Sequence, residues 1–169
     1  MAEATKIKVG VCSVVFNGLD LGHTKGGVEV SYEPAHYDVM VDKYGGTPVE
    51  KILVGEKWTA KVALAEATIA NFRVSMPQTE FAGAGNSRIT VGAAAGKKAT
   101  DDAKQLVLHP INEGTKAFDV VFYKAYVGST IALPHKNDSE KLVEVVFEAL
   151  IDESRSDGNY LGLIGDSTL

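Results

Sequence analysis

The stretch DLGHTKGGVEVSYEP, residues 20–34, places two glycines directly before a strand-like alternation. The apolar side chains share one parity and the acidic ones the other: Val28, Val30 and Tyr32 against Glu29 and Glu33. Alternation with a period of two predicts a strand that has one apolar and one acidic face. The glycines predict a turn that leads into this strand. An acidic strand face either meets solvent or lines something, and the residues around it bear on that choice.

The alternation resumes in HYDVMVD, residues 36–42, after Pro34 interrupts the first run. Two alternating segments joined by a short EPAH connection are typical of a hairpin. We therefore expect residues 27–33 to pair with residues 36–42. The polar faces of this hairpin would carry four carboxylates: Glu29, Glu33, Asp38 and Asp42.

Further strands are predicted on both sides of this segment. Val- and Ile-rich or alternating runs occupy residues 7–16, 48–64, 105–110 and 117–128, and the second of these is long enough for one or two strands. Residues 142–151 fit both a helical stripe and strand alternation, and their β-branched content favours a strand.

One helix is expected where the period changes. Ala65, Ile69, Phe72 and Met76 recur at helical spacing, and Pro77 ends the pattern. The Gly- and Ala-rich stretch 78–104 is typical of a loop, with a short strand at RITVG. The chain therefore predicts a single domain, residues 1–169, with a mainly β sandwich or barrel of two sheets and one flanking helix.

Composition narrows the class of protein. The formal net charge is −5, which is unlike a protein that grips phosphate backbones or a membrane surface. The one cysteine, Cys12, can form neither an intramolecular disulfide nor a thiolate cluster. The sequence has no signal-like start and no apolar run of membrane-spanning length, so we expect a protein made and kept in a cytoplasm-like compartment.

Catalytic patterns are weak. GAAAGKK at residues 92–98 has three residues between its glycines where a phosphate-binding loop has four. The histidines have no metal-ligand spacing: His23, His36, His109 and His135. We therefore predict no catalytic, cofactor-binding or metal-binding residues, and favour an interaction or structural protein over an enzyme. A β-sandwich binding module also stays open.

Residues 17–72 resemble the major tail tube proteins of long-tailed, siphovirus-type bacteriophages. The resemblance lies in the Leu-Gly-x-Thr-x-Gly-Gly-Val run of residues 21–28 and in the turn marked by Asp42, Gly45 and Pro48. A strand with a central Val62 follows, and then Glu66 opens the predicted helix. These features occur in the order and spacing of that family and cover about a third of the chain.

The resemblance implies a β-sandwich shared with contractile-tail and type VI secretion tubes. It also implies homohexameric rings that stack into a hollow tube, through which double-stranded DNA is delivered. The expected partners are other copies of the chain, a tape measure protein, a tail terminator and distal tail or baseplate proteins. The expected location is the virion tail, after assembly in the host bacterial cytoplasm. A type VI secretion tube and a tail-completion or connector ring are the alternatives.

If the chain forms a DNA conduit, its acidic strand face has a function in the lumen. Lysines on the wall would hold phosphates, whereas carboxylates repel them and keep the duplex centred. We therefore predict Glu29, Glu33, Asp38 and Asp42 as lumen-lining residues. Lys57, Lys61 and Lys124 also lie on polar strand faces and would weaken this repulsion if they faced the lumen. The 78–104 loop and the terminal arms, residues 1–6 and 160–169, are predicted to contact neighbouring subunits and rings.

Overall fold

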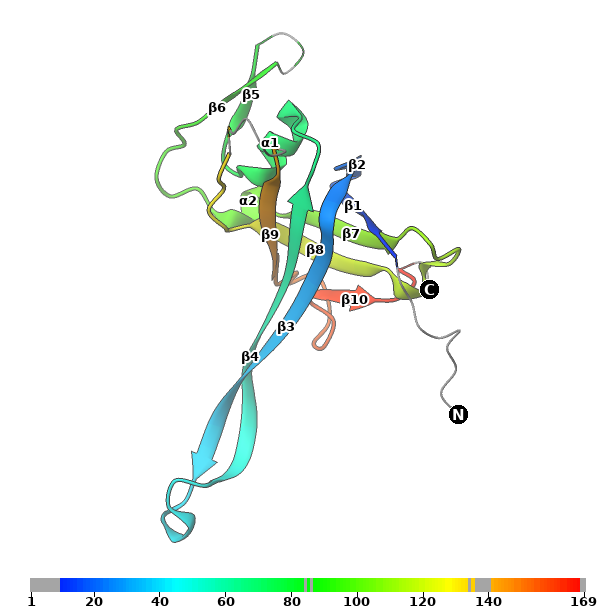
Figure 1. The fold of residues 1–169 in the computed structure, drawn as a ribbon. Helices are drawn as coiled ribbons and strands as arrows, with labels where there is room; N and C mark the ends of the chain where they lie inside the picture. Colours follow the sequence, from blue (N-terminus) through cyan, green and yellow to red (C-terminus); the bar gives the residue numbers. More distant parts are fainter. Residues whose placement is uncertain (1–9, 84, 86, 134, 136–140, 168–169) are drawn as a thin grey trace.

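The computed structural model describes residues 10–83, 85, 87–133, 135 and 141–167 (Figure 1). The N-terminal arm predicted at residues 1–6 lies outside these residues. Strands dominate the described part, and they are β1 (Cys12–Phe16), β2 (Leu19–Asp20), β3 (Thr24–Met40), β4 (Pro48–Leu64), β5 (Glu80–Ala82), β6 (Arg88–Thr90), β7 (Lys104–Pro110), β8 (Val120–Val127), β9 (Val143–Leu150) and β10 (Gly162–Ile164). The helical elements are α1 (Ile69–Ser75), α2 (Ala99–Asp102) and the 3₁₀ turns η2 (Asp42–Tyr44) and η4 (Lys116–Phe118). The prediction of a mainly β fold is confirmed.

One large antiparallel sheet forms the body. Its strand order is β2-β1-β7-β8-β9-β4-β3, and β10 also pairs with β8. β10 lies along the first half of β8 and β9 along the second half of the same edge. The second sheet contains only β5 and β6. The strand that β-branched content favoured over a helix at 142–151 is β9.

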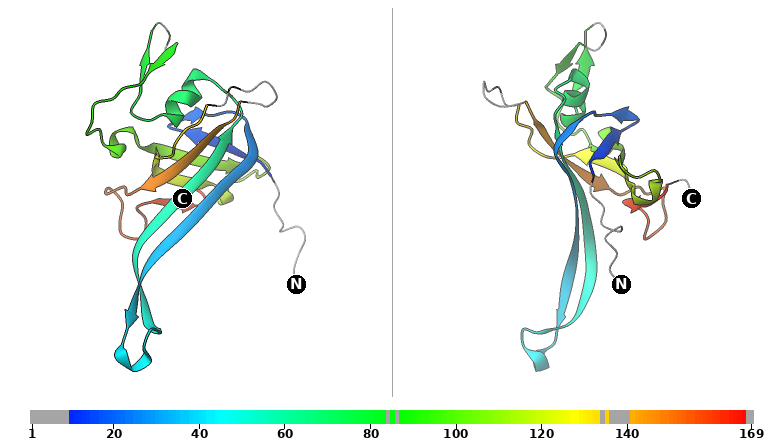
Figure 2. Two further views of the ribbon diagram at one scale, coloured as in Figure 1. Left: turned by 60° about the vertical axis from the view of Figure 1, so that its left-hand side comes forward. Right: turned by 45° about the vertical axis from the view of Figure 1, so that its right-hand side comes forward.

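The large sheet folds over its own core. Phe16 on β1 and Phe147 on β9 are three strands apart in the sheet, yet their rings lie 5.3 Å apart. Trp58 on β4 likewise meets Phe122 on β8, at 4.4 Å between ring centroids. The two halves of the sheet therefore face each other, as Figure 2 shows from two sides. The core is completed by fully buried aliphatic side chains, among them Val14, Val62, Leu64, Leu106, Leu108, Val143 and Val145.

The hairpin predicted between residues 27–33 and 36–42 is wrong. Residues 24–40 form one continuous strand, which pairs instead with β4 over its whole length. Pro34 does not interrupt it because β3 is the last strand of the sheet, and an edge strand needs no amide hydrogen on its outer side. The turn between the two long strands is η2 with the glycines after it.

Hydrogen bonds join the glycine turn before β3 to α1 and to the segment just before it. The backbone N–H of His23 donates to the Glu66 carboxylate at 2.9 Å, and Asn71 Nδ2 donates to the Leu21 carbonyl at 2.9 Å. Gly22 has a φ of +78°, and a Cβ there would lie 2.3 Å from the Glu66 carboxylate carbon. Only glycine fits this turn.

The expected helix is present but shorter, and its buried face is rotated. Thr68 caps α1 by accepting a hydrogen bond from the Asn71 N–H at 3.1 Å. Phe72 packs on the core as predicted, whereas Ile69 is exposed. Asn71 and Ser75 are buried instead, and the cost of burying their polar side chains is offset by hydrogen bonds that they donate to backbone carbonyls.

Residues 160–167, predicted as part of a terminal arm, pack against the body. β10 pairs with β8, and Gly162 is pressed between this strand and Trp58. A Cβ on Gly162 would lie 2.1 Å from the Val121 carbonyl oxygen and 2.5 Å from the Trp58 ring. This contact ties the end of the chain to the core.

We predict that Gly162→Ala destabilises the fold by about 1–3 kcal/mol, because the methyl group overpacks the β10–Trp58 contact. Urea unfolding followed by Trp58 fluorescence measures the change. Gly46→Ala is the matched control, since Gly46 has no atom within 4 Å of the added Cβ and has no left-handed backbone. Equal stability of the two variants would contradict the packing described.

Candidate assembly surface on the extended hairpin

The outer half of the β3–β4 hairpin leaves the body as an extended arm, residues 34–56 (Figures 1 and 2). β9 pairs with β4 only from Thr59 to Leu64, so among the described residues no third strand supports the arm. Its residues are exposed almost throughout. A two-stranded ribbon without a packing partner is at best marginally stable in water.

Both edges of the arm are open. β3 is the last strand in the sheet order, so its outer edge has no partner among the described strands. β4 pairs with β9 at its inner end alone, which leaves its other edge open along the arm. Open edges present rows of N–H and C=O groups that other strands can pair with. Open strand edges of this length are normally covered by another segment or paired with another strand.

The arm also exposes many large apolar side chains. Tyr37 is 63% exposed and Val54 is 64% exposed. The others that are at least two-fifths exposed are Met40, Val41, Tyr44, Val49, Ile52 and Leu53. So many exposed large apolar side chains on one segment mark a protein–protein contact more often than a solvent-facing surface.

The pairing register divides the hairpin into two faces. In the body, one face joins the core through pairs such as Val28 with Val62, and we call the opposite face the outer face. A bulge between Ala35 and His36 shifts the register, and from there the outer face carries Tyr37 opposite Ile52. The outer face therefore carries charged pairs in the body, whereas on the arm it carries Tyr37 opposite Ile52 and then Val39 opposite Glu50.

The four predicted lumen-lining carboxylates do not share one face. Glu29 and Glu33 lie on the outer face, opposite Lys61 and Lys57. Asp38 has the other parity and lies on the opposite face of the ribbon, where it pairs with Lys51. Asp42 is the first residue of η2 at the tip of the arm. Successive side chains of a strand point to opposite faces. Glu29 and Glu33 have odd residue numbers and Asp38 has an even one, so the continuous strand places Asp38 on the other face.

The outer face of the body carries a regular charge pattern across three strands. Lys57 and Lys61 on β4 are each opposite a glutamate of β3. On the other side, Lys57 lies 3.6 Å from Glu148 and Lys61 lies 3.8 Å from Glu144, both on β9. We call these six residues the charge ladder: Glu29, Glu33, Lys57, Lys61, Glu144 and Glu148.

Lys124 continues this arrangement on β8. Its ammonium group lies 3.0 Å from Asp152, and this hydrogen bond is the main reason that the pKa of Asp152 is lowered, with Ser154 second. The lysines that the sequence placed on polar strand faces are therefore each beside a carboxylate. The outer face therefore carries lysines beside its carboxylates, the arrangement that would weaken repulsion of DNA if this face lined a lumen.

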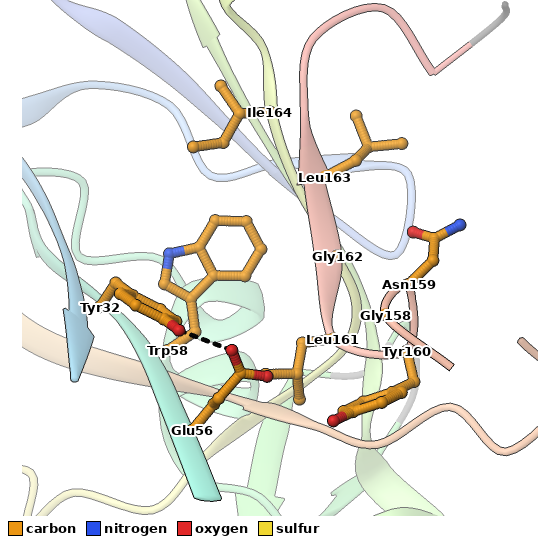
Figure 3. A pocket seen from close by; sticks show the side chains of 10 residues that line it. All are labelled: Tyr32, Glu56, Trp58, Gly158, Asn159, Tyr160, Leu161, Gly162, Leu163 and Ile164. Carbon is orange, nitrogen blue, oxygen red and sulfur yellow. Dashed lines mark hydrogen bonds between the residues drawn. The ribbon is translucent and has the colours of Figure 1, made fainter. Parts of the chain in front are cut away.

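A groove of about 380 Å³ lies at the base of the arm, between the hairpin and β10 (Figure 3). The Tyr32 hydroxyl donates to Glu56 Oε1 at 2.5 Å, and this hydrogen bond is the main cause of the raised pKa of Tyr32. Trp58 and residues 158–164 form the remaining walls. The lining is mostly aromatic and aliphatic, which suits packing against another apolar surface.

The Gly- and Ala-rich stretch 78–104 holds β5, β6 and α2. α2 is attached to α1, because Asp102 accepts hydrogen bonds from Arg73 at 3.3 Å and from the Gln78 N–H at 2.7 Å. Val91, between β6 and α2, is 77% exposed. The part nearest the body is thus anchored, and the prediction that the stretch contacts neighbouring copies stays a prediction.

Titratable side chains elsewhere pair within the body. His109 Nδ1 lies 2.5 Å from the buried Asp119 carboxylate, which joins β7 to the start of β8. Within the described residues, no group of three or more His, Cys, Asp or Glu side chains could hold a metal ion. In the same part of the chain, no helix has the length and apolar character that a bilayer crossing needs.

The chain matches no family model, and no curated protein matches it either.

The exposed arm predicts that polar substitutions there leave the stability of the isolated subunit unchanged. Tyr37→Ser combined with Ile52→Ser should change the free energy of unfolding by less than about 0.5 kcal/mol. Phe147→Ala in the core should cost about 3–5 kcal/mol. Urea titrations of dilute protein compare the two, and a large loss in the arm variant would mean that the arm packs on its own subunit.

Cys12 should react slowly with alkylating agents. Burial, followed by the Asp119 carboxylate, raises the pKa of the thiol to about 11. The thiolate is the reactive form, so its fraction stays small at neutral pH and grows as pH rises toward the pKa. The iodoacetamide labelling rate should therefore still be rising at pH 10, and a rate that levels off below pH 9 would contradict this environment.

Proposed function

We propose that this chain is the structural subunit of the tail tube of a long-tailed bacteriophage. In this proposal six copies close into a ring, rings stack into a hollow tube, and double-stranded DNA passes through the bore. The observation that carries it is the arm, residues 34–56, with its open edges and exposed apolar side chains. The resemblance of residues 17–72 to tail tube proteins supports the same assignment.

A symmetric assembly of identical chains would cover both the open strand edges and the exposed apolar side chains of the arm. An open strand edge repeats in every copy, and a ring closes all of these edges at once. Apolar side chains such as Tyr37 and Ile52 become buried when neighbouring copies cover the arm. Burial of such side chains contributes about 25 cal/mol per Å², so several of them on each arm stabilise an assembly substantially.

The outer face of the body is the surface that fits the bore. It is polar and lies opposite the core, so it needs no cover. We assign Glu29 and Glu33 to the bore. Asp38 is paired with Lys51 on the opposite face, so we place it outside the bore, and Asp42 belongs to the tip, where copies meet. The tape measure, terminator and distal tail proteins stay the partners that the resemblance implies.

Negative-stain microscopy and sedimentation velocity test this proposal. The purified chain should form rings or hollow tubes as its concentration rises. Tyr37→Glu with Ile52→Glu should keep the subunit folded but abolish assembly, because the two new carboxylates on each arm would be buried against apolar side chains.

Ile111→Glu with Phe118→Glu is the matched control, since both side chains are exposed on the body rather than on the arm. Assembly should survive in this control. A wild-type chain that stays monomeric at high concentration and at all ionic strengths would contradict the proposed function. Assembly of the arm variant would show that the arm is not the contact.

A further inference from the structure

The charge ladder places each central lysine between carboxylates of two different strands. Lys61 is flanked by Glu29 on β3 and by Glu144 on β9, and the latter oxygen lies 3.8 Å from the ammonium nitrogen. The same pattern recurs four residues along β4, where Glu33 and Glu148 flank Lys57. Two independent repeats of one arrangement form a continuous patch on the outer face.

We propose that the charge ladder is a non-adhesive surface for double-stranded DNA, on which glutamates screen the lysines from phosphates. This inference rests on the proposed function, in which the outer face lines the bore. It extends that function by naming the groups that prevent capture of the moving duplex. It also accounts for the lysines on this face, because carboxylates beside them neutralise their charge in place.

Electrostatic distances support this role. The two ion pairs of β4 with β9 are shorter than 4 Å, well inside the screening length of about 8 Å at physiological ionic strength. A phosphate that approaches either lysine therefore meets a carboxylate at nearly the same distance. Binding would require the phosphate to displace a partner that is already in contact, so the gain from counterion release is largely lost.

The ladder also avoids the cost of an all-acidic surface. Four carboxylates against two ammonium groups leave it net negative but with a small charge density. A ring brings several copies of this face together, and unpaired carboxylates in that number would repel one another and oppose closure. Pairing the charges keeps the wall weakly repulsive to DNA while the copies can still assemble.

Stability is a poor explanation for the pattern. The side chain of Lys57 is 55% exposed and that of Lys61 is 57% exposed, and exposed ion pairs contribute little to folding. The glutamates can therefore be replaced without unfolding the subunit. That makes a direct test possible on the soluble chain.

The test measures binding of a short DNA duplex by fluorescence anisotropy as a function of salt concentration. The fourfold variant E29Q/E33Q/E144Q/E148Q exposes Lys57 and Lys61 and should bind the duplex at low salt, whereas the wild-type chain should not. Two freed lysines predict a slope of about −2 in log K against log salt. Adding K57Q and K61Q to this variant should abolish the gain.

The control variant E50Q/E113Q/E153Q/D157N makes the same change in net charge outside the ladder. It should bind no better than wild type. Equal binding by the control and the ladder variant would overturn the proposal, because net charge alone would then explain the gain. The absence of any gain in the ladder variant, or duplex binding by the wild-type chain, would overturn it as well.

This result is separate from the assembly test. DNA binding is measured on soluble subunits, whereas the proposed function is judged by rings or tubes in the microscope. Tubes together with an unchanged ladder variant would refute the ladder and leave the tube. A ladder variant that gains DNA binding without tubes would refute the tube and leave the neutralisation of the lysines.

Discussion

The pairing of β3 with β4 is the interaction on which the rest of the structure depends. It runs through fourteen residue pairs, from the core of the body to the tip of the arm. In the body the pairing is supported by β9 and by buried side chains such as Val62. On the arm the same backbone pairing continues without that support. One element therefore has a stable base and an end that requires other molecules.

The change of character along the hairpin follows from one bulge and from strand parity. Before the bulge at Ala35 and His36, the outer face holds the charge ladder, and after it the same face holds Tyr37 and Ile52. A charged face is compatible with water, whereas exposed large apolar side chains such as these mark a contact surface. In the proposed tube, the outer face of the body lines the bore and a neighbouring copy covers the arm.

Much of the fold could be predicted from the sequence because alternation identifies strands well. The strands at 105–110 and 142–151 follow from their alternating and β-branched residues. Pro34 misled the prediction, because a proline breaks a central strand but not an edge strand, and the sequence does not reveal which strand is at the edge. The pairing of residues 24–40 with 48–64 is a non-local property that periodicity cannot supply.

The candidate site was only partly accessible from the sequence for the same reason. Parity alone groups Glu29 with Glu33, and the structure places both on the outer face. The lysines opposite them depend on the register between β3 and β4. Glu144 and Glu148 depend on the neighbouring strand β9, which follows about eighty residues later in the chain. The exposure of the arm could have been inferred from the sequence, because the run at residues 48–64 is longer than an ordinary strand.

Hydrogen exchange at the arm tests the central claim most directly. Amides of residues 35–40 and 49–56 should exchange quickly in dilute subunits, because the arm has open edges and no packing partner among the described strands. In assembled material the same amides should become strongly protected, while amides of the core strands should change little. Equal exchange of the arm in both states would contradict the claim that a second copy covers it.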